Sequence, residues 1–135
     1  MVALTVVDSN VWIFLNLETA PEHGAARSQL EKHRERGLQI NAIILSEVFH
    51  KLSILLGVEE ARGRVNKILG SSFVVYESLS LETAQRALGI ASQHRIRIND
   101  ALIAAHALDA RTALLTDNEK DFRRIKGLKL IALQR

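Results

Sequence analysis

The sequence has no cysteine and only one proline among its 135 residues. Without cysteine there are no disulfides and no thiolate metal sites, so any bound metal ion needs oxygen or imidazole ligands. The lack of cysteine also favours a reducing compartment, and we expect a cytoplasmic protein. No run of about 20 apolar residues is present to cross a membrane. The stretch from Met1 to Val7 has neither the basic region nor the cleavage site of a secretory signal.

The charge of the chain is slightly positive, with 18 Lys and Arg against 15 Asp and Glu and a formal net charge of +3. This balance alone is as typical of an ordinary basic protein as of one that binds a polyanion. If several acidic residues gather around a cation, however, the remaining surface is distinctly basic. That arrangement suits an enzyme that cleaves a phosphate backbone, because bases attract the backbone while acids hold the metal.

Short apolar runs alternate with helical patterns along the whole chain. The length and the 47% of hydrophobic residues suit a single domain over residues 1–135. Strands are expected at residues 3–7, 38–42, 73–76, 112–116 and 128–133. Helices are expected at residues 11–15 with Ser9 or Asn10 as cap, 22–36, 43–56, 58–69, 80–94 with Ser80 as cap, and 100–110 with Asn99 as cap. This alternation predicts a three-layer α/β/α fold around a mostly parallel five-stranded sheet.

Acidic residues stand at places where the surrounding sequence is apolar. Asp8 ends the first strand, Glu47 interrupts a hydrophobic helix, and Asp100 opens the most apolar helix. A further polar group follows the fourth strand directly, namely Asp117, Asn118 and Asp121. Each has an ordinary structural explanation as a helix cap, a residue at the positive end of a helix, a solvent-facing side chain or a turn residue.

Taken together, these positions indicate a shared site. Ligands of open α/β sheets bind beyond the carboxyl ends of the strands, where the strand order reverses. Asp8 and Asp117 both follow predicted strands, and they meet if those strands are neighbours. Several carboxylates at close range require a cation, and Mg²⁺ or Mn²⁺ prefers oxygen ligands. Such an ion activates water for hydrolysis of a phosphodiester, so no side-chain nucleophile is required.

Four segments carry a resemblance to a known family: VVDSNVWI at residues 6–13, LSEVFHKL at 45–52, INDALIAAHAL at 98–108 and LLTDNEKDF at 114–122. In their order and spacing the chain resembles PIN-domain proteins, especially VapC-type toxins of toxin–antitoxin pairs. The resemblance implies a PIN-like fold and Mg²⁺- or Mn²⁺-dependent cleavage of RNA. It also implies a homodimer that a VapB-like antitoxin neutralises. The helix rich in apolar residues at 11–17 is a candidate contact surface for these partners.

The resemblance assigns roles to individual residues. It implies that Asp8 and Asp100 bind metal and that Glu47 joins them, with Asn10 and Thr116 in support. The fourth acidic position departs from the pattern, because Asn118 stands where many relatives have an acid. The remaining ligand is therefore Asp117, which we include among the metal ligands, or Asp121, which we include among the catalytic residues, or Asn118 itself as a neutral ligand.

Basic residues near these acids are candidate contacts for RNA, although solvated surface charge explains each equally well. They are Lys51, Arg95 and Arg97, together with Arg123, Arg124 and Lys126. His50 and His106 lie on apolar helices, where a histidine of the core is the expected role.

Two other functions deserve comparison with the nuclease. A PIN-like module that binds RNA without cleaving it has the same overall pattern. A phospho-acceptor receiver domain also has five strands and an acidic pocket, but its acceptor aspartate follows the third strand. Here that strand, FVVY, ends without an aspartate, so the receiver function is disfavoured.

Overall fold

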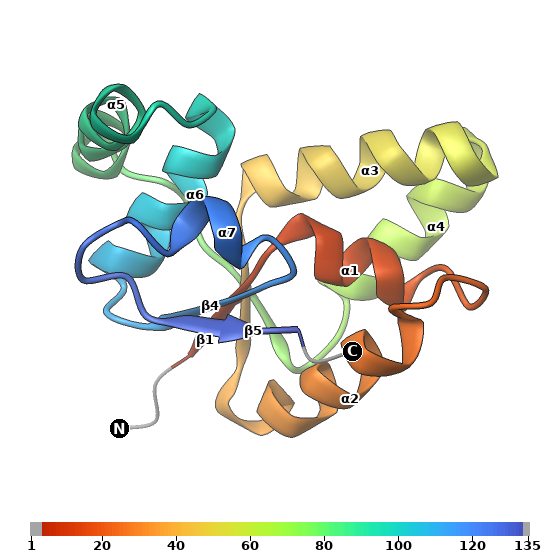
Figure 1. Cartoon of the computed structure of the whole chain (residues 1–135). Coiled ribbons are helices and arrows are strands. Elements are labelled where there is room, and N and C mark those ends of the chain that lie inside the picture. The colour runs from red at the N-terminus through yellow and green to blue at the C-terminus, as the bar shows by residue number, and fades with distance from the viewer. Residues whose placement is uncertain (1–3, 134–135) are drawn as a thin grey trace.

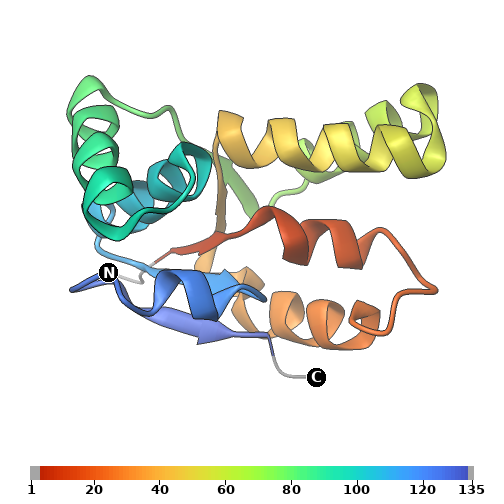
Figure 2. The ribbon, with the colours of Figure 1, turned by 45° about the horizontal axis from the view of Figure 1, so that its top comes forward.

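The computed structural model describes residues 4–133. Their strands form one sheet of five, shown in Figure 1 and, turned by 45°, in Figure 2. The strand order is β3-β2-β1-β4-β5, and every neighbouring pair is parallel. The strands are β1 (Thr5–Val7), β2 (Leu38–Ile40), β3 (Val74–Tyr76), β4 (Ala113–Thr116) and β5 (Leu130–Ala132). The predicted five-stranded sheet is thus confirmed, and it is parallel throughout the described residues.

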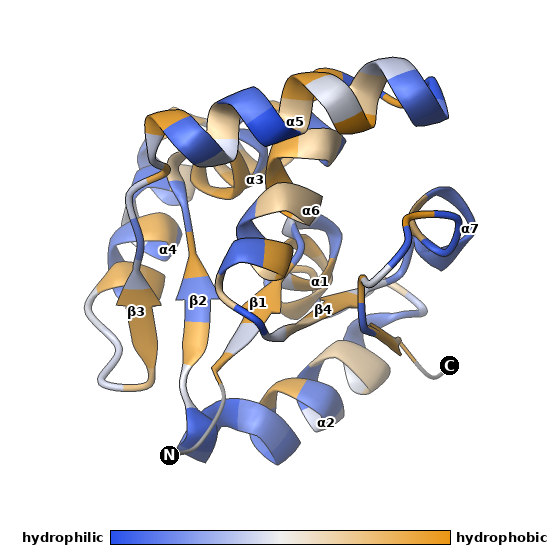
Figure 3. Ribbon diagram, turned by 90° about the vertical axis from the view of Figure 1, so that its left-hand side faces the viewer, coloured by the Kyte–Doolittle hydropathy of each residue, from blue (hydrophilic) through white to orange (hydrophobic). Residues whose placement is uncertain are grey.

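Helices cover both faces of this sheet. They are α1 (Ser9–Leu15), α2 (His23–His33), α3 (Ala42–Leu56), α4 (Val58–Leu69), α5 (Leu81–His94), α6 (Ile98–Asp109) and the short α7 (Glu119–Phe122), with a 3₁₀ turn at Arg34–Arg36. Figure 3 shows α6 in front of the sheet, with α5 above it against α6, and α1 and α4 behind the sheet. The predicted three-layer architecture is confirmed. Within residues 4–133 no helix is both long enough and apolar enough to cross a membrane.

The order of the strands places the reversal of the chain between β1 and β4. The chain starts at the central β1, adds β2 and β3 on one side, and then crosses to β4 and β5 on the other. Val7 is in register with Leu115, and the Asp8 amide donates to the Leu115 carbonyl at 2.9 Å. The residues that follow β1 and β4 therefore lie side by side at one edge, where α/β sheets bind their ligands.

Several predicted boundaries are wrong by one or two residues. Asp8, rather than Ser9 or Asn10, is the N-cap of α1, and Arg97 rather than Asn99 precedes α6. The second strand ends at Ile40 because Asn41 caps α3, accepting a hydrogen bond from the Ile44 amide at 2.9 Å. The helix α7 was not predicted. The first residue of the first predicted strand, at position 3, lies outside the described residues.

The buried core lies on both faces of the sheet, and α6 contributes much of it on one face. The helix buries almost its whole circumference, as its sequence predicts, including Ala101 and Ile103. β1 is buried along its length, and its Val6 and Val7 are fully inaccessible. A buried central strand and a buried helix fix the two backbone elements that carry Asp8 and Asp100.

Candidate active site

Asp8 lies at the carboxyl end of β1 and is only 4% exposed. Its carboxylate accepts hydrogen bonds from the Ser9 amide at 2.8 Å, from Thr116 Oγ1 at 2.7 Å and from Asn10 Nδ2 at 3.5 Å. The Thr116 bond crosses from β4 to β1 and joins residues 108 positions apart. The capping role and the position in the acidic cluster are therefore combined in one side chain.

Glu47 and Asp100 lie close together on either side of a single arginine. The Arg97 guanidinium donates to Glu47 Oε2 at 3.2 Å and to the two carboxylate oxygens of Asp100 at 3.4 Å each. Ser9 Oγ donates to Glu47 Oε1 at 2.9 Å and so connects Glu47 to the residue next to Asp8. The structure brings together three acids from the first strand, the third helix and the sixth helix.

The electrostatics of Asp8 reflect this convergence. Its pKa is raised from 3.8 to about 6, mainly by burial and to a smaller extent by the nearby charges of Asp100 and Glu47. The hydrogen bonds from Thr116 and Ser9 lower the pKa, but they do not offset the loss of hydration. Its hydrogen-bond donors among residues 4–133 are all neutral, so within this part of the chain the Asp8 carboxylate is a buried charge without a counter-ion.

Three polar residues after β4 complete one wall of the site. The Asp117 amide donates to Asn10 Oδ1 at 3.2 Å, and the Asn118 amide donates to Thr116 Oγ1 at 2.9 Å. Asn118 Nδ2 donates to Asp121 Oδ2 at 3.0 Å. Asn118 and Asp121 line a pocket of about 270 Å³ with Asp100, whereas Asp117 is not among its lining residues. The pocket favours Asp121 over Asp117 as the acid that faces Asp100.

The donor set suits a hard divalent cation chemically. The carboxylates, the amide of Asn10 and the hydroxyls of Ser9 and Thr116 offer only oxygen ligands to an ion at this edge. As the side chains lie, no three carboxylate or imidazole groups among residues 4–133 are grouped to hold one ion. The Arg97 guanidinium instead lies between Glu47 and Asp100 and neutralises them in part. A cation at this site therefore competes with Arg97 for the same oxygens.

The comparison with protein families decides the classification. The PIN domain family matches the sequence over residues 5–128. The chain is a PIN domain protein. This match covers most of the chain and confirms the resemblance drawn from the four segments. No sequence among curated proteins matches the chain.

Solved structures with the same fold include a toxin and VapBC complexes. VapBC2 from Rickettsia felis, bound to a DNA fragment from its promoter, is 21% identical with a TM-score of 0.80, covering 97% of this chain and 99% of the other. DNA-bound VapBC from Salmonella typhimurium is 20% identical with a TM-score of 0.79, covering 98% and 99%. VapC20 from Mycobacterium tuberculosis, a Sarcin-Ricin loop cleaving toxin, is 20% identical with a TM-score of 0.70, covering 80% and 84%. These likenesses establish a shared fold.

The basic residues of this PIN domain differ in their positions. Arg95, Arg97 and Arg124 line the pocket beside Asp100, and Arg124 also donates to the His94 carbonyl at 3.1 Å. Lys51 is exposed on α3 and is not among the lining residues of that pocket. The exposed Arg123 and Lys126 also lie outside it.

Sequence reasoning missed Ser9 as a hydrogen-bond partner of Glu47. The only signal in the sequence was a hydroxyl residue next to the first aspartate.

The two histidines of the apolar helices have opposite environments. His50 is exposed, so its predicted place in the core is wrong. His106 is 3% exposed and its Nδ1 lies 2.8 Å from Asn41 Nδ2, which confirms the core role. Burial lowers the pKa of His106. The bond to Asn41 joins α6, which carries Asp100, to the start of α3, which carries Glu47.

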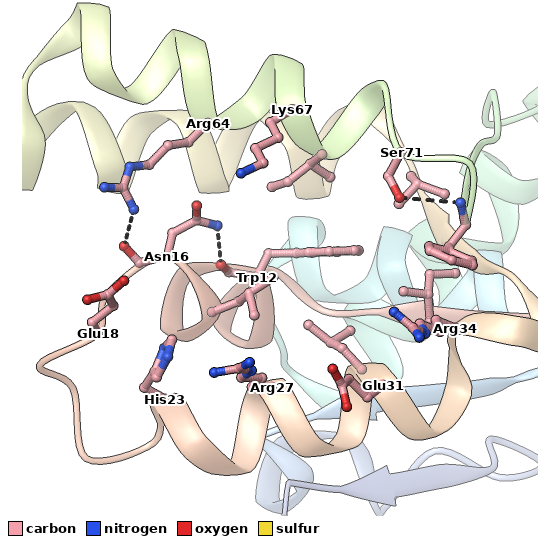
Figure 4. Close-up of a pocket in the computed structure, with 16 residues that line it drawn as sticks. Trp12, Asn16, Glu18, His23, Arg27, Glu31, Arg34, Arg64, Lys67 and Ser71 are labelled. Atoms are coloured by element: carbon pink, nitrogen blue, oxygen red, sulfur yellow. Dashed lines mark hydrogen bonds between the residues drawn. The ribbon is translucent and has the colours of Figure 1, made fainter.

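A second pocket of about 480 Å³ lies between α1, α2 and α4, away from the acids (Figure 4). Trp12 from α1 forms part of its wall and is only 3% exposed, and its indole Nε1 has no hydrogen-bond partner within the described residues. The charged side chains around the apolar interior are four bases and two acids, namely Arg27, Arg34, Arg64 and Lys67 with Glu18 and Glu31. The helix at residues 11–17 was predicted to be an exposed contact surface. Val11 and Trp12 are instead buried, and residues 13–17 are half-buried.

Proposed function

We propose that this PIN domain is a Mg²⁺- or Mn²⁺-dependent endoribonuclease and the toxin of a VapBC-type toxin–antitoxin pair. The observation that carries the proposal is the convergence of Asp8, Glu47 and Asp100 at the carboxyl edge of the sheet of a PIN domain. The fold it shares with VapBC toxins, and with a toxin that cleaves the Sarcin-Ricin loop, supports the same activity.

Asp8, Glu47 and Asp100 are the proposed metal ligands, with Asp121 or Asp117 as the fourth acid. A bound divalent ion would supply a lowered pKa for water and stabilisation of the charge that develops on the phosphodiester. Thr116 and the Ser9 amide hold the Asp8 carboxylate in one orientation, and Ser9 Oγ orients Glu47. Ligands fixed in this way need little reorganisation when the transition state forms.

Arg97 has two proposed tasks at this edge. Its guanidinium neutralises Glu47 and Asp100 in the absence of a cation, and its side chain is 70% exposed. Once a cation occupies the carboxylates, the same guanidinium is placed to donate to a phosphate of the RNA. Arg95 and Arg124 line the same pocket and offer further positive charge to the backbone.

Arg97→Gln should therefore increase the affinity for Mg²⁺ about threefold, because it removes a competing positive charge from an exposed position. The affinity for RNA should fall at the same time. Titration calorimetry with MgCl₂ and with a non-cleavable RNA measures both quantities. Arg124→Gln is the matched control, since Arg124 lines the same pocket but forms no ion pair with an acid of the described residues. An equal effect of the two variants on Mg²⁺ binding would contradict competition by Arg97.

The partners follow from the same proposal. A VapB-like antitoxin is the proposed neutralising partner, and the pocket beside Trp12 and Leu15 is its proposed contact surface. An apolar interior surrounded by four bases and only two acids suits an amphipathic segment that carries more acidic than basic side chains. A homodimer and a location in the cytoplasm belong to the proposal as well.

Cleavage of RNA tests the proposal directly. The purified chain should cut a structured RNA in Mg²⁺ or Mn²⁺, and excess chelator should stop the reaction. The alternative is a PIN-like module that binds RNA without turnover. Binding of RNA both with the divalent cation and with chelator, and no cleavage under either condition, would establish the module and refute the nuclease. Addition of Ca²⁺ in place of Mg²⁺ gives a control in which the carboxylates are occupied by a cation of poor catalytic geometry.

A further inference from the structure

A third pocket lies at the opposite edge of the sheet from the acids. Its volume is about 400 Å³, and Thr5 and Ala113, the first residues of β1 and β4, belong to its lining. Arg36, just before β2, and Lys129, just before β5, lie at the same edge. Strands of three or four residues span roughly 10–13 Å. The full length of β1 and β4 therefore separates this pocket from Asp8 and Thr116.

The pocket is lined by positive charge. Its titratable lining residues among those described are His33, Arg36, Arg111 and Lys129, and none is acidic. Arg36, Arg111 and Lys129 form no ion pair with any other residue between positions 4 and 133. The pKa of His33 is lowered by burial and then by the charges of Lys32 and Arg36. Three unneutralised cations around one cavity repel each other, and an anion relieves that repulsion.

Buried polar atoms beside the same cavity lack partners. Thr112 is 9% exposed, and its Oγ1 has no hydrogen-bond partner within the described part of the chain. The same holds for His33 Nε2. Both residues line the pocket. A buried hydroxyl without a partner is costly, and a ligand oxygen that accepts its proton removes the cost.

The backbone places Arg111 at this pocket in an unusual conformation. Its φ of 54° lies in the left-handed region, just after the C-cap of α6. The Arg111 amide donates to the Leu108 carbonyl and the Thr112 amide to the Ala107 carbonyl, both at 3.1 Å. Glycine is the usual residue at this point of a helix end. Here the position instead places an arginine in the lining of a pocket that Arg36 and Lys129 also line.

We propose that this pocket binds a phosphate group, held by Arg36, Arg111 and Lys129 and by the hydroxyl of Thr112. Guanidinium groups match phosphate oxygens in geometry and charge. The phosphate comes either from the solution or from the backbone of an RNA. The site is separate from the acidic edge and does not depend on whether the chain cleaves RNA.

Amide NMR spectra of the full chain, recorded in chelator, test the site without catalysis. Inorganic phosphate should shift the amides of Arg111 and Thr112 saturably at constant ionic strength. Arg111→Gly should weaken this binding about tenfold or more, and it relieves the left-handed backbone, so the fold is retained. Arg62→Gln on α4 is the control of equal charge, since Arg62 is exposed and does not line the pocket.

Thr112→Val provides a second and independent variant. It removes the unpartnered hydroxyl at constant shape, so the variant should be at least as stable as the wild type without phosphate and should bind phosphate more weakly. A short RNA that shifts the same amides, and that phosphate displaces, identifies the backbone as the source; a response to phosphate alone identifies a free anion. Shifts that are linear and spread over the surface, or that persist unchanged in Arg111→Gly, would overturn the proposal.

Discussion

Asp100→Asn should reduce cleavage of RNA by about a thousandfold, which corresponds to a loss of about 4 kcal/mol of transition-state stabilisation. Asp100 lies in the first turn of α6, is 8% exposed and shares Arg97 with Glu47. Asparagine has nearly the same shape, so the helix and the packing of the core are retained. What is lost is the negative charge that we propose binds the cation. Initial rates on a defined RNA at saturating Mg²⁺ measure the effect.

The control for this variant is on the same helix. Asp109→Asn makes the same chemical change at the other end of α6, where Asp109 bonds to Thr83 and Arg86 at 2.6 Å each. It should leave the cleavage rate within about twofold, because the surface pair that it disrupts contributes little energy. Equal losses in the two variants would attribute the effect to the helix and not to the site. Full activity of Asp100→Asn would remove Asp100 from the proposed ligands.

The sequence predicts the layers of this fold and the elements that carry the acids. Hydrophobic periodicity identifies β1 and α6, since one is a buried strand and the other a helix that is apolar almost all round. The adjacency of Asp8 to the residues after β4 was conditional at that stage. It depended on the strand order, which involves pairing over about a hundred residues and leaves no local pattern.

The contacts between the acids were beyond sequence reasoning for a physical reason. A spacing of three residues indicates that Arg97 can pair with Asp100 on one helix. No local rule indicates that the same guanidinium also meets Glu47, which lies 50 residues away. The choice among Asp117, Asn118 and Asp121 likewise depends on α7. This helix has only four residues and was not visible in the sequence. It turns Asp121 back toward Asn118 and into the pocket of Asp100.

Charged residues gather at both edges of the sheet. Asp8, Glu47 and Asp100 lie at the carboxyl edge of the sheet, and Arg36, Arg111 and Lys129 lie at the amino edge. From composition we expected an acidic spot surrounded by bases, and Arg95, Arg97 and Arg124 do lie beside Asp100. The second group of bases, at the amino edge, is a property of the fold. A phosphate backbone would be attracted to the basic edge without competing with a cation for the carboxylates.

Asp8→Asn should increase the stability of the fold at neutral pH, even though it removes a proposed ligand. The pKa of Asp8 is about 6 in the folded chain, against an ordinary value of 3.8, which we take for the unfolded chain. Between about pH 4 and pH 6 the folded state therefore retains a proton that the unfolded state has released. The free energy of unfolding of the wild type falls as pH rises through this window, by roughly 3 kcal/mol at most. The variant lacks this fall and should be more stable at pH 7–8 by about 1–3 kcal/mol.

Urea denaturation in chelator at pH 4, 5, 6, 7 and 8 measures the free energies of unfolding of Asp8→Asn and of the wild type. Asp121→Asn is the control, because Asp121 is exposed at the same edge. The difference between Asp8→Asn and the wild type should grow between pH 4 and pH 6 and then stay constant, whereas the control should run parallel to the wild type. Mg²⁺ at pH 7.5 should then stabilise the wild type and not Asp8→Asn, because an ion that binds only the folded state shifts unfolding by mass action. If Asp8→Asn is less stable than the wild type at every pH, the hydrogen bonds of Asp8 with Thr116 and Ser9 outweigh the cost of the buried charge. If Mg²⁺ stabilises both proteins equally, the ion binds elsewhere.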